Sequence, residues 1–282
     1  MSVASANDQC GASADPAHLY LELMKKCVAN TIYSDPELVA VAPSAAVKKW
    51  IAAMFKAAGL TLARVKTTSV EKRRKGLDGN PRAHTMIGLE RLDNIQRCVQ
   101  SVIDDRIPGD LIEAGVWRGG ATAFMRAVLK ANGVRDRTVW VADSFAGLPL
   151  PDEDRYPPDK GDVHHTYTWL AIPIEEVKET FRAYDLLDDQ VRFLQGWFKD
   201  TLPTAPIEGL AVIRLDADMY QSTMDGLVNL YPKLSVGGYV ILDDWELIPS
   251  CRRAIEDFRA RHGIEEPIRS VDGNAGYWRR ER

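Results

Sequence analysis

Two short apolar runs in the sequence are each followed directly by acidic residues. The first run spans 210–215 and the second spans 239–242, and both have the composition of buried parallel strands. Four acids follow them: Asp216, Asp218, Asp243 and Asp244. Ligands of an open α/β sheet bind outside the carboxyl ends of its strands. If the two strands are neighbours, we expect these carboxylates to converge at one edge of the sheet.

A cluster of carboxylates needs positive charge beside it, because like charges repel when they are held together. A bound cation is the simplest source of that charge. Oxygen ligands without cysteine or histidine favour Mg²⁺ or Ca²⁺ over Zn²⁺. The alternative is that these acids cap helices or lie in solvated loop ends, where they need no metal. Two acid pairs at two strand ends favour the metal site.

A glycine-rich turn lies earlier in the chain. The segment 113–120 joins a predicted strand to a predicted helix and contains Gly115 and the pair Gly119–Gly120. Glycines here let a ligand approach the backbone, and the helix start offers free N–H groups, although such glycines also serve plain packing. The next predicted strand ends at Asp143, where an acid can bind both ribose hydroxyls of a nucleotide-like ligand.

The charge of Glu113 indicates which ligand this turn would bind. A dinucleotide would place its pyrophosphate here, and the carboxylate would repel it, whereas an ammonium or sulfonium group would be attracted. S-adenosylmethionine combines a ribose, an α-ammonium group and a sulfonium. The turn therefore favours a methyltransferase over a dehydrogenase.

The elements that must position these residues alternate between strands and helices from residue 110 onward. Predicted strands cover 110–115, 138–142, 191–194, 210–215 and 239–242, and predicted helices cover 119–132, 174–184, 222–233 and 249–262. This order predicts an α/β fold, with a mostly parallel sheet covered by helices on both faces. Short runs at 268–271 and 277–278 predict an antiparallel pair at one edge. Residues 144–173 form a long insertion rich in proline and aspartate.

The N-terminal part of the chain lacks this alternation. We expect three parts: a disordered tail over 1–16, a helical or lid segment over 17–83, and the sheet domain over 84–282. Helices are predicted at 18–30, 45–63 and 85–102. The first is expected to present Leu19, Leu23 and Cys27 on one face, and Trp50, Met54 and Phe55 are the apolar anchors of the second. Since these helices are too apolar for a free tail, we expect a homo-oligomer or a docked lid.

Composition excludes several classes of protein. The chain has 282 residues and a net charge of −4, which gives no reason to propose a nucleic-acid partner. Its four cysteines are scattered, as in proteins of a reducing compartment. No signal peptide and no run of membrane-spanning length is visible, so we expect a cytoplasmic protein with no membrane partner.

Several motifs together resemble one enzyme family. They are the stretches 84–92, 111–120, 141–149 and 214–220 and the pair Asp243–Asp244. The chain resembles the macrocin O-methyltransferases, which methylate sugar hydroxyls of macrolide and aminocoumarin antibiotics. The resemblance implies a class I (Rossmann-like) methyltransferase fold with a seven-stranded sheet, S-adenosylmethionine as donor, a required Mg²⁺ and a small-molecule glycoside as substrate.

The same resemblance assigns residues to roles. It implies three metal ligands, Asp216, Asp243 and Asp244. It implies that the donor is bound by Thr85, Met86, Glu113, Gly115, Val116, Trp117, Asp143, Ser144, Phe145, Gln195 and Trp197. Catechol-type methyltransferases have a lysine base three residues after the first metal ligand, and here that position is Met219.

The expected mechanism needs a base for the sugar hydroxyl. Asp216 is the first candidate and Asp218 the second, while His164 and His165 in the insertion are a third possibility against a plain role as exposed loop residues. Two other functions stay open. One is a Mg²⁺-dependent methyltransferase of a phenol or catechol, and the other is a non-catalytic sheet protein that binds a nucleotide.

Overall fold

The core of the molecule is a seven-stranded sheet in the order β5-β4-β3-β6-β7-β9-β8. The computed structural model describes residues 15–33, 37–40, 46–61, 63–66, 69–78 and 82–282. The strands are β3 (Asp110–Ala114), β4 (Val139–Asp143), β5 (Val191–Gln195), β6 (Leu210–Leu215), β7 (Leu234–Leu242), β8 (Arg269–Ser270) and β9 (Gly276–Arg279). Strands β3 to β7 run parallel, and β9 pairs antiparallel with β7 and β8. The predicted α/β sheet with an antiparallel edge is confirmed.

Strand β6 lies between β3 and β7 and is buried along its whole length. Its apolar run needs cover on both faces of the sheet, which parallel strands obtain from helices. Leu215 at the end of β6 pairs with Leu242 at the end of β7. The acids that follow these two residues therefore start from the same edge of the sheet.

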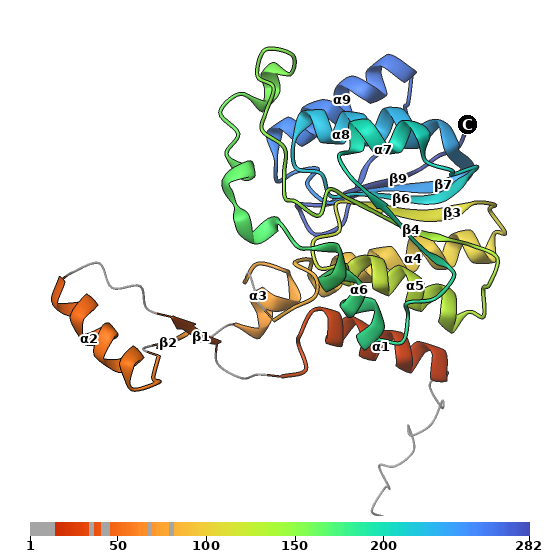
Figure 1. Ribbon diagram of the computed structural model, residues 1–282. Coiled ribbons are helices and arrows are strands. Elements are labelled where there is room, and N and C mark those ends of the chain that lie inside the picture. The colour runs from red at the N-terminus through yellow and green to blue at the C-terminus, as the bar shows by residue number, and fades with distance from the viewer. Residues whose placement is uncertain (1–14, 34–36, 41–45, 62, 67–68, 79–81) are drawn as a thin grey trace, which may run out of the picture.

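Helices cover both faces of the sheet (Figure 1). One face is covered by α1 (Pro16–Val28), α4 (Leu89–Asp104), α5 (Gly120–Ala131) and α6 (Ile174–Ala183), and the other by α7 (Phe198–Thr201), α8 (Tyr220–Leu230) and α9 (Pro249–His262). Each face has its own apolar core. Among the described residues, no helix combines the length and the apolar character that crossing a membrane requires.

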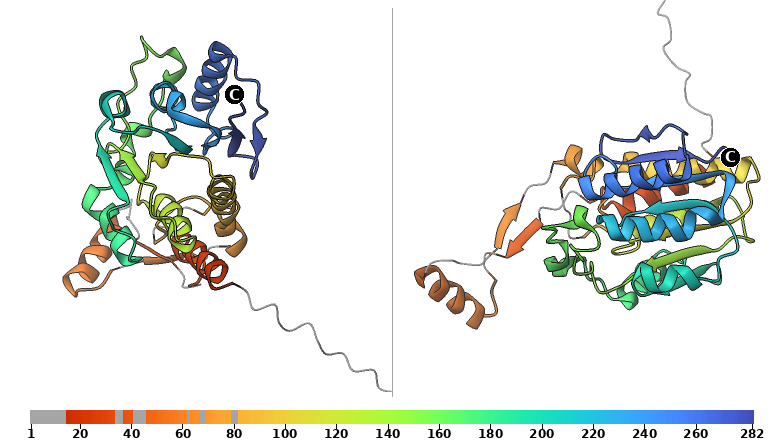
Figure 2. Two further views of the ribbon diagram at one scale, coloured as in Figure 1. Left: turned by 90° about the vertical axis from the view of Figure 1, so that its right-hand side faces the viewer. Right: turned by 90° about the horizontal axis from the view of Figure 1, so that it is seen from above.

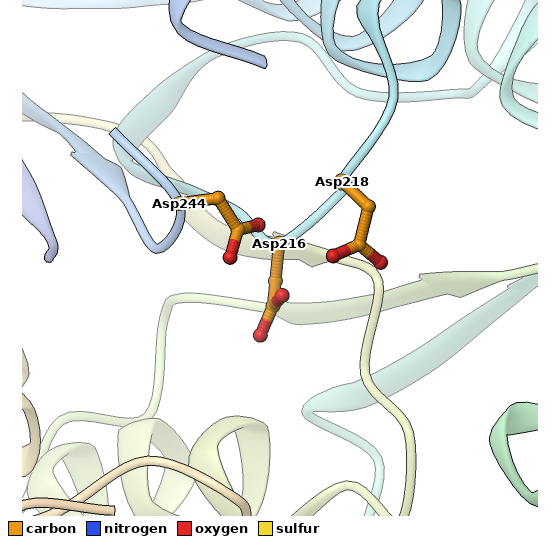
Figure 3. Close-up of side chains that lie close together, drawn as sticks. All are labelled: Asp216, Asp218 and Asp244. Carbon is orange, nitrogen blue, oxygen red and sulfur yellow. The ribbon is translucent and has the colours of Figure 1, made fainter. Parts of the chain in front are cut away.

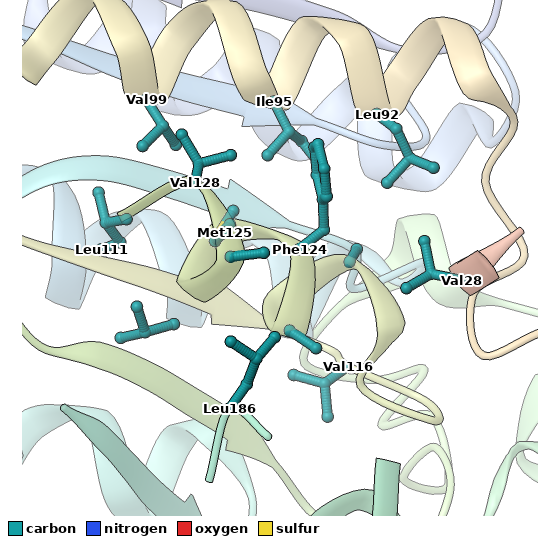
Figure 4. Close-up of a cluster of buried hydrophobic side chains, with 14 of the residues drawn as sticks. Val28, Leu92, Ile95, Val99, Leu111, Val116, Phe124, Met125, Val128 and Leu186 are labelled. Atoms are coloured by element: carbon teal, nitrogen blue, oxygen red, sulfur yellow. The ribbon is translucent and has the colours of Figure 1, made fainter. Parts of the chain in front are cut away.

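The larger core joins the N-terminal helix to the sheet domain (Figure 4). Leu92, Ile95 and Val99 of α4 pack in one cluster with Phe124 of α5, and Val28 of α1 belongs to the same cluster. All of these side chains are fully buried. Burying each is worth about 1.5–3 kcal/mol, so α1 is part of the folded body.

Helix α1 packs through a different face from the predicted one. Leu19 and Leu23 are more than half exposed, whereas Leu21, Met24 and Val28 are buried. The sequence holds two apolar stripes on this helix, and only packing against α5 decides between them. Residues 1–14 of the predicted disordered tail lie outside the described residues. Its last residue, Pro16, is the first residue of α1.

A short ribbon and a helix project away from the body (Figures 1 and 2). The ribbon pairs β1 (Glu37–Ala40) antiparallel with β2 (Ala63–Lys66), and α2 (Ala46–Ala57) lies between them in the chain. The ribbon was not predicted, and the predicted helix over 45–63 is shorter than expected. After the ribbon, a short helix, α3 (Val70–Arg74), begins at its cap Ser69.

Candidate active site

Three acids from two neighbouring strand ends lie together in the structure. Asp216 follows β6, Asp218 lies in the loop from β6 to α8, and Asp244 lies just beyond β7. One carboxylate oxygen of each lies within 4.8 Å of the others. Figure 3 shows the three side chains grouped at this edge of the sheet. The acids after β6 and β7 thus converge, as the strand order requires.

These three carboxylates carry more negative charge than their surroundings offset. Burial raises the pKa of Asp216 and of Asp244 well above the ordinary range, and the neighbouring carboxylates add to the rise. Burial also raises the pKa of Asp218 to about 6, against the opposing charge of His164. The Oδ2 atom of Asp244 is buried with no hydrogen-bond partner. Carboxylates in this condition fit a divalent cation that prefers oxygen ligands.

Asp243 is held by two arginines instead. Its Oδ1 accepts a hydrogen bond from Arg214, and its Oδ2 accepts one from Arg91 at 2.6 Å. Arg91 also donates to Asp272 at 2.7 Å. Both oxygens of Asp243 are therefore committed to guanidinium groups. The three acids that the structure groups together therefore include Asp218, whereas the three predicted metal ligands included Asp243.

Arg214 connects this arginine-paired set to the three grouped acids. It lies inside the apolar strand β6 and is 1% exposed. It donates to Glu113 and, at 3.1 Å, to Asp216. Burial alone would lower the pKa of Arg214, but the carboxylates of Asp243 and Glu113 raise it, so the guanidinium stays charged. Sequence reasoning missed this residue, although a charged residue inside an apolar strand was a visible signal.

Glu113 serves the interior of the sheet. It is 1% exposed, and besides the ion pair with Arg214 it accepts a hydrogen bond from the Thr122 hydroxyl. Burial raises the pKa of Glu113, and the charge of Arg214 opposes that rise. Glu113 does not line the pocket beside the acids. The structure therefore does not place its carboxylate where it was predicted to attract the ammonium group of the donor.

A pocket opens beside the three acids at the carboxyl ends of the strands. Eight predicted site residues line it: Met86, Gly115, Trp117, Asp143, Ser144, Trp197, Asp216 and Asp218. The predicted donor residues of β3 and β4 and the acids of β6 thus share one cavity.

Asp143 lies where the second strand of the predicted nucleotide site ends. Its two oxygens accept hydrogen bonds from the backbone N–H groups of Val116 and Phe145, each at 2.8 Å. Burial raises the pKa of Asp143, and these hydrogen bonds oppose the rise. They also fix the carboxylate at the pocket wall, where its Oδ1 lies 3.4 Å from the Ser144 hydroxyl as well.

The remaining predicted donor residues do not line the pocket. Thr85 is buried, and its hydroxyl accepts from the backbone of Ile87 at 3.4 Å. Val116 and Phe145 belong to the core, and Gln195 is exposed at the end of β5. The structure therefore places these four side chains behind or beside the cavity.

The glycines of the turn are explained by backbone packing. A Cβ on Gly115 would lie 1.8 Å from the carbonyl oxygen of Asp216, and Gly115 has a φ of +89°. A Cβ on Gly120 would lie 2.4 Å from the carbonyl oxygen of His84. Both glycines thus let the strand ends and the 84–88 segment pack closely, which is the alternative that the sequence left open.

Backbone strain is concentrated around the pocket. Trp117, Phe145 and Asp218 have φ values of +47°, +55° and +56°, a region that non-glycine residues rarely adopt. They follow β3, β4 and β6, three adjacent strands whose ends contribute to the cavity. Such strain persists where the surrounding structure enforces it, and it gathers at functional sites.

Sequence reasoning missed part of the wall. The missed residues come from the insertion, from the loop after β6, from α7 and from the first half of α8: Gly147, Leu148, Pro149, Leu170, Lys199, Ala217, Gln221, Ser222 and Asp225. Residues 147–149 end one of the motifs noted above, so that signal was available. The residues of α7 and α8 carried none, because only the sheet order brings them to this edge.

Comparison with known proteins decides the family. The chain matches the family of macrocin-O-methyltransferases (TylF) over residues 17–280. The chain belongs to this family. Membership shows that it is an O-methyltransferase and implies S-adenosylmethionine as the methyl donor.

Characterised relatives span nearly the whole chain. The demethyldecarbamoylnovobiocin O-methyltransferase of Streptomyces niveus is 50% identical over 265 residues, which cover 94% of each protein. The mycinamicin III 3''-O-methyltransferase of Micromonospora griseorubida is 48% identical over 267 residues, covering 93% of this chain and 96% of that enzyme. Both relatives are therefore matched over nearly their whole length.

Solved structures confirm the class I methyltransferase fold of this macrocin O-methyltransferase family member. The O-methyltransferase NovP is 49% identical, superposes with a TM-score of 0.82, and is matched over 94% of this chain and 100% of its own. The calicheamicin methyltransferase CalS11 is 20% identical with a TM-score of 0.55, over 86% of this chain and 95% of its own, and shares the fold.

Met219, at the position of the catechol-type lysine, is fully buried.

Proposed function

We propose that this protein transfers the methyl group of S-adenosylmethionine to a hydroxyl of a deoxysugar on a glycosylated natural product, with Mg²⁺ bound by the acids of β6 and β7. One observation carries the proposal. Three poorly neutralised carboxylates lie together, and two of them, Asp216 and Asp218, line one pocket with six of the residues predicted to bind the donor. The names of the relatives, demethyldecarbamoylnovobiocin O-methyltransferase and mycinamicin III 3''-O-methyltransferase, support a natural-product acceptor, and membership of the macrocin-O-methyltransferase family supports a sugar hydroxyl on it.

The donor would occupy the part of the pocket formed by β3 and β4. Asp143 would accept hydrogen bonds from the ribose hydroxyls, as acids at this strand end do in nucleotide sites. Trp117 and Met86 would cover the methionine portion, and Trp197 would lie by the adenine. This arrangement would direct the sulfonium methyl toward Asp216 and Asp218, which line the same cavity.

The acids fit a magnesium ion. Asp216 and Asp244 belong both to the predicted ligand set and to the three grouped acids, and Asp244 offers a buried oxygen without a partner. When bound, Mg²⁺ would supply Lewis acidity toward a sugar hydroxyl and a fixed point for orienting the ring. The third protein ligand is Asp218 in the arrangement seen here, and Asp243 in the predicted set.

With Asp243 as the third metal ligand, Asp218 is the better placed of the two predicted bases. Asp216 already accepts a hydrogen bond from Arg214, whereas Asp218 stands on a strained loop at the pocket wall. As the acceptor oxygen attacks the methyl carbon, the bond from that carbon to sulfur breaks, and a carboxylate there can accept the hydroxyl proton. S-adenosylhomocysteine and the methyl ether would be the products.

A methyl-transfer assay with two kinds of acceptor tests the proposal. Demethylated glycosides and simple catechols are compared, each with Mg²⁺ and with a chelator. We expect transfer to a glycoside that the chelator abolishes. Transfer to catechols alone would overturn the sugar assignment in favour of the phenol or catechol alternative. Binding of S-adenosylmethionine without any transfer would favour the non-catalytic alternative.

A homo-oligomer stays a prediction. On α2, the expected anchors Trp50, Met54 and Phe55 are exposed, with Trp50 at 66%. Leu19 and Leu23 of α1 are exposed as well. Light scattering during size-exclusion chromatography tests the prediction. A monomer at all concentrations would contradict it.

A further inference from the structure

One acid of the insertion, distant in sequence from the grouped acids, is buried in the structure. Asp159 is 1% exposed, although it lies in a segment of short turns: η1 (Pro157–Asp159), η2 (His164–Thr166) and η3 (Thr168–Leu170). Its Oδ1 accepts a hydrogen bond from the backbone N–H of Tyr220 at 2.6 Å, and its Oδ2 accepts one from Gln221 at 2.9 Å. These are the first two residues of α8.

Asp159 thus supplies the N-terminal cap of α8 from 61 residues away in sequence. The residue at the cap position of the helix itself, Met219, makes no side-chain cap hydrogen bond. Unpaired N–H groups at a helix start favour an acidic partner, since the helix dipole is positive there. The contact therefore satisfies two donors that the local sequence leaves open.

The turn that carries Asp159 is stiff. Two prolines, Pro157 and Pro158, precede Asp159 and restrict the backbone. The ring of Tyr156 lies against the ring of Tyr220, with centroids 6.2 Å apart. The backbone N–H of Asp162 donates to the carbonyl of Asp159 at 3.0 Å. The Asp159 carboxylate and the ring pair of Tyr156 and Tyr220 thus hold the insertion against α8. The closed turn stiffens the segment that carries them.

This fastening joins two walls of the candidate active site. Helix α8 starts directly after the loop that holds Asp218, and its Gln221 and Ser222 line the pocket. The insertion lines the same pocket through 147–149 and Leu170. At its far end the insertion is tied to the donor side, where the Trp117 indole donates to the carbonyl of Trp169 at 3.2 Å.

We propose that Asp159 is a positioning residue for the acceptor: by holding the insertion on the start of α8, it fixes the pocket wall that faces Asp218. This inference rests on the proposed function, because it concerns the acceptor of the same reaction. Asp159 touches neither donor nor acceptor in this account. It acts through the backbone of Tyr220 and Gln221, and through the part of the insertion that follows it.

Asp159→Asn tests the proposal, since the amide nitrogen cannot accept a hydrogen bond from a backbone N–H. Asp154→Asn is the matched control, because Asp154 is an exposed acid of the same insertion. We expect the acceptor KM of Asp159→Asn to rise about tenfold, as a displaced substrate wall would cause. Donor affinity, measured by calorimetry, should stay at the wild-type value in both variants.

Two results would overturn the proposal. One is an acceptor KM in Asp159→Asn equal to that of Asp154→Asn. The other is a joint loss of donor affinity, acceptor affinity and Tm, which would mean that Asp159 only stabilises the fold. If Asp159→Asn does not fold, Tyr156→Leu loosens the same turn without leaving a polar group unpaired, and it should raise the acceptor KM with donor affinity unchanged.

Limited proteolysis separates a failure of this proposal from a failure of the proposed function. It needs no acceptor, so it remains informative if the wild type transfers no methyl group to any glycoside. We expect cleavage within 144–173 to be faster in Asp159→Asn than in Asp154→Asn. Equal cleavage rates would show that Asp159 does not hold the insertion, whatever the enzyme methylates.

Discussion

Two sets of acids lie at the same edge of the sheet, and their surroundings differ. In the arginine-paired set, Glu113, Asp243 and Asp272 are bonded to Arg214 and Arg91. In the grouped set of Asp216, Asp218 and Asp244, the described residues make one ion pair, that of Asp216 with Arg214. The first set has its charge balanced by the fold, whereas the second is left for a ligand to balance.

The difference separates a structural role from a functional one. A buried ion pair adds little to stability in itself, but breaking it by removing one partner leaves a buried charge alone. Removing an acid from the grouped set has the opposite electrostatic effect, because it relieves repulsion. Stability and activity should therefore respond to substitutions in the two sets in opposite ways.

The largest expected effect is on the arginine-paired set. Arg214→Met removes the partner of Glu113 and Asp243 inside the sheet, and it should lower the free energy of unfolding by about 3–5 kcal/mol. Urea denaturation measures this. A loss below about 1 kcal/mol would show that the carboxylates become protonated without cost, and that the pairing is not what holds this edge together.

Asp244→Asn should act on function and spare stability. With the unpartnered oxygen replaced by an amide, methyl transfer should fall on the order of a hundredfold or more, the scale of a lost electrostatic element in an active site. Without metal, Tm should equal or exceed that of the wild type, since one of three repelling charges is gone. Calorimetric scanning and turnover are measured on the same preparation. A lower Tm with unchanged turnover would reverse the two roles.

The pH dependence of magnesium stabilisation should sharpen the contrast. Burial raises the pKa of Asp218 to about 6, and it raises those of Asp216 and Asp244 as well. A raised pKa means that the folded state binds protons more tightly than the unfolded state. The metal-free protein therefore loses this contribution to stability as the pH rises through about 6. Mg²⁺ binds the charged form, so it should raise Tm by several degrees at pH 7.5 and by much less at pH 5. Equal shifts at both pH values would contradict this.

The sheet could be predicted from sequence because its signals are local. The run Leu210–Leu215 and the helix over 249–262 were predicted with the bounds that the structure has. Apolar runs that end in acids, alternating with periodic helices, leave few other arrangements. The N-terminal region was less predictable. Helix α1 carries two apolar stripes, and the β1–β2 ribbon has pairing partners more than twenty residues apart.

The site was predictable as a location but not as a set of contacts. The strand ends located the pocket, and Asp143 and Trp117 were placed at its wall. The roles of Asp243 and Glu113 depend on Arg214 and Arg91, which come from another strand and another helix. Sequence alone does not say which acid an arginine reaches. For the same reason Asp159 carried no signal: its partners lie on α8.

Calorimetric titration of Mg²⁺ into metal-stripped protein tests the central claim most directly. Wild type, Asp244→Asn and Asp243→Asn are compared in the presence of S-adenosylmethionine. We expect Mg²⁺ to bind wild type at one site and to lose that binding in Asp244→Asn, with donor binding kept in both. Loss in Asp243→Asn as well would make Asp243 the third ligand, and its retention there would favour Asp218. Undiminished binding to Asp244→Asn, or none to wild type, would contradict the account.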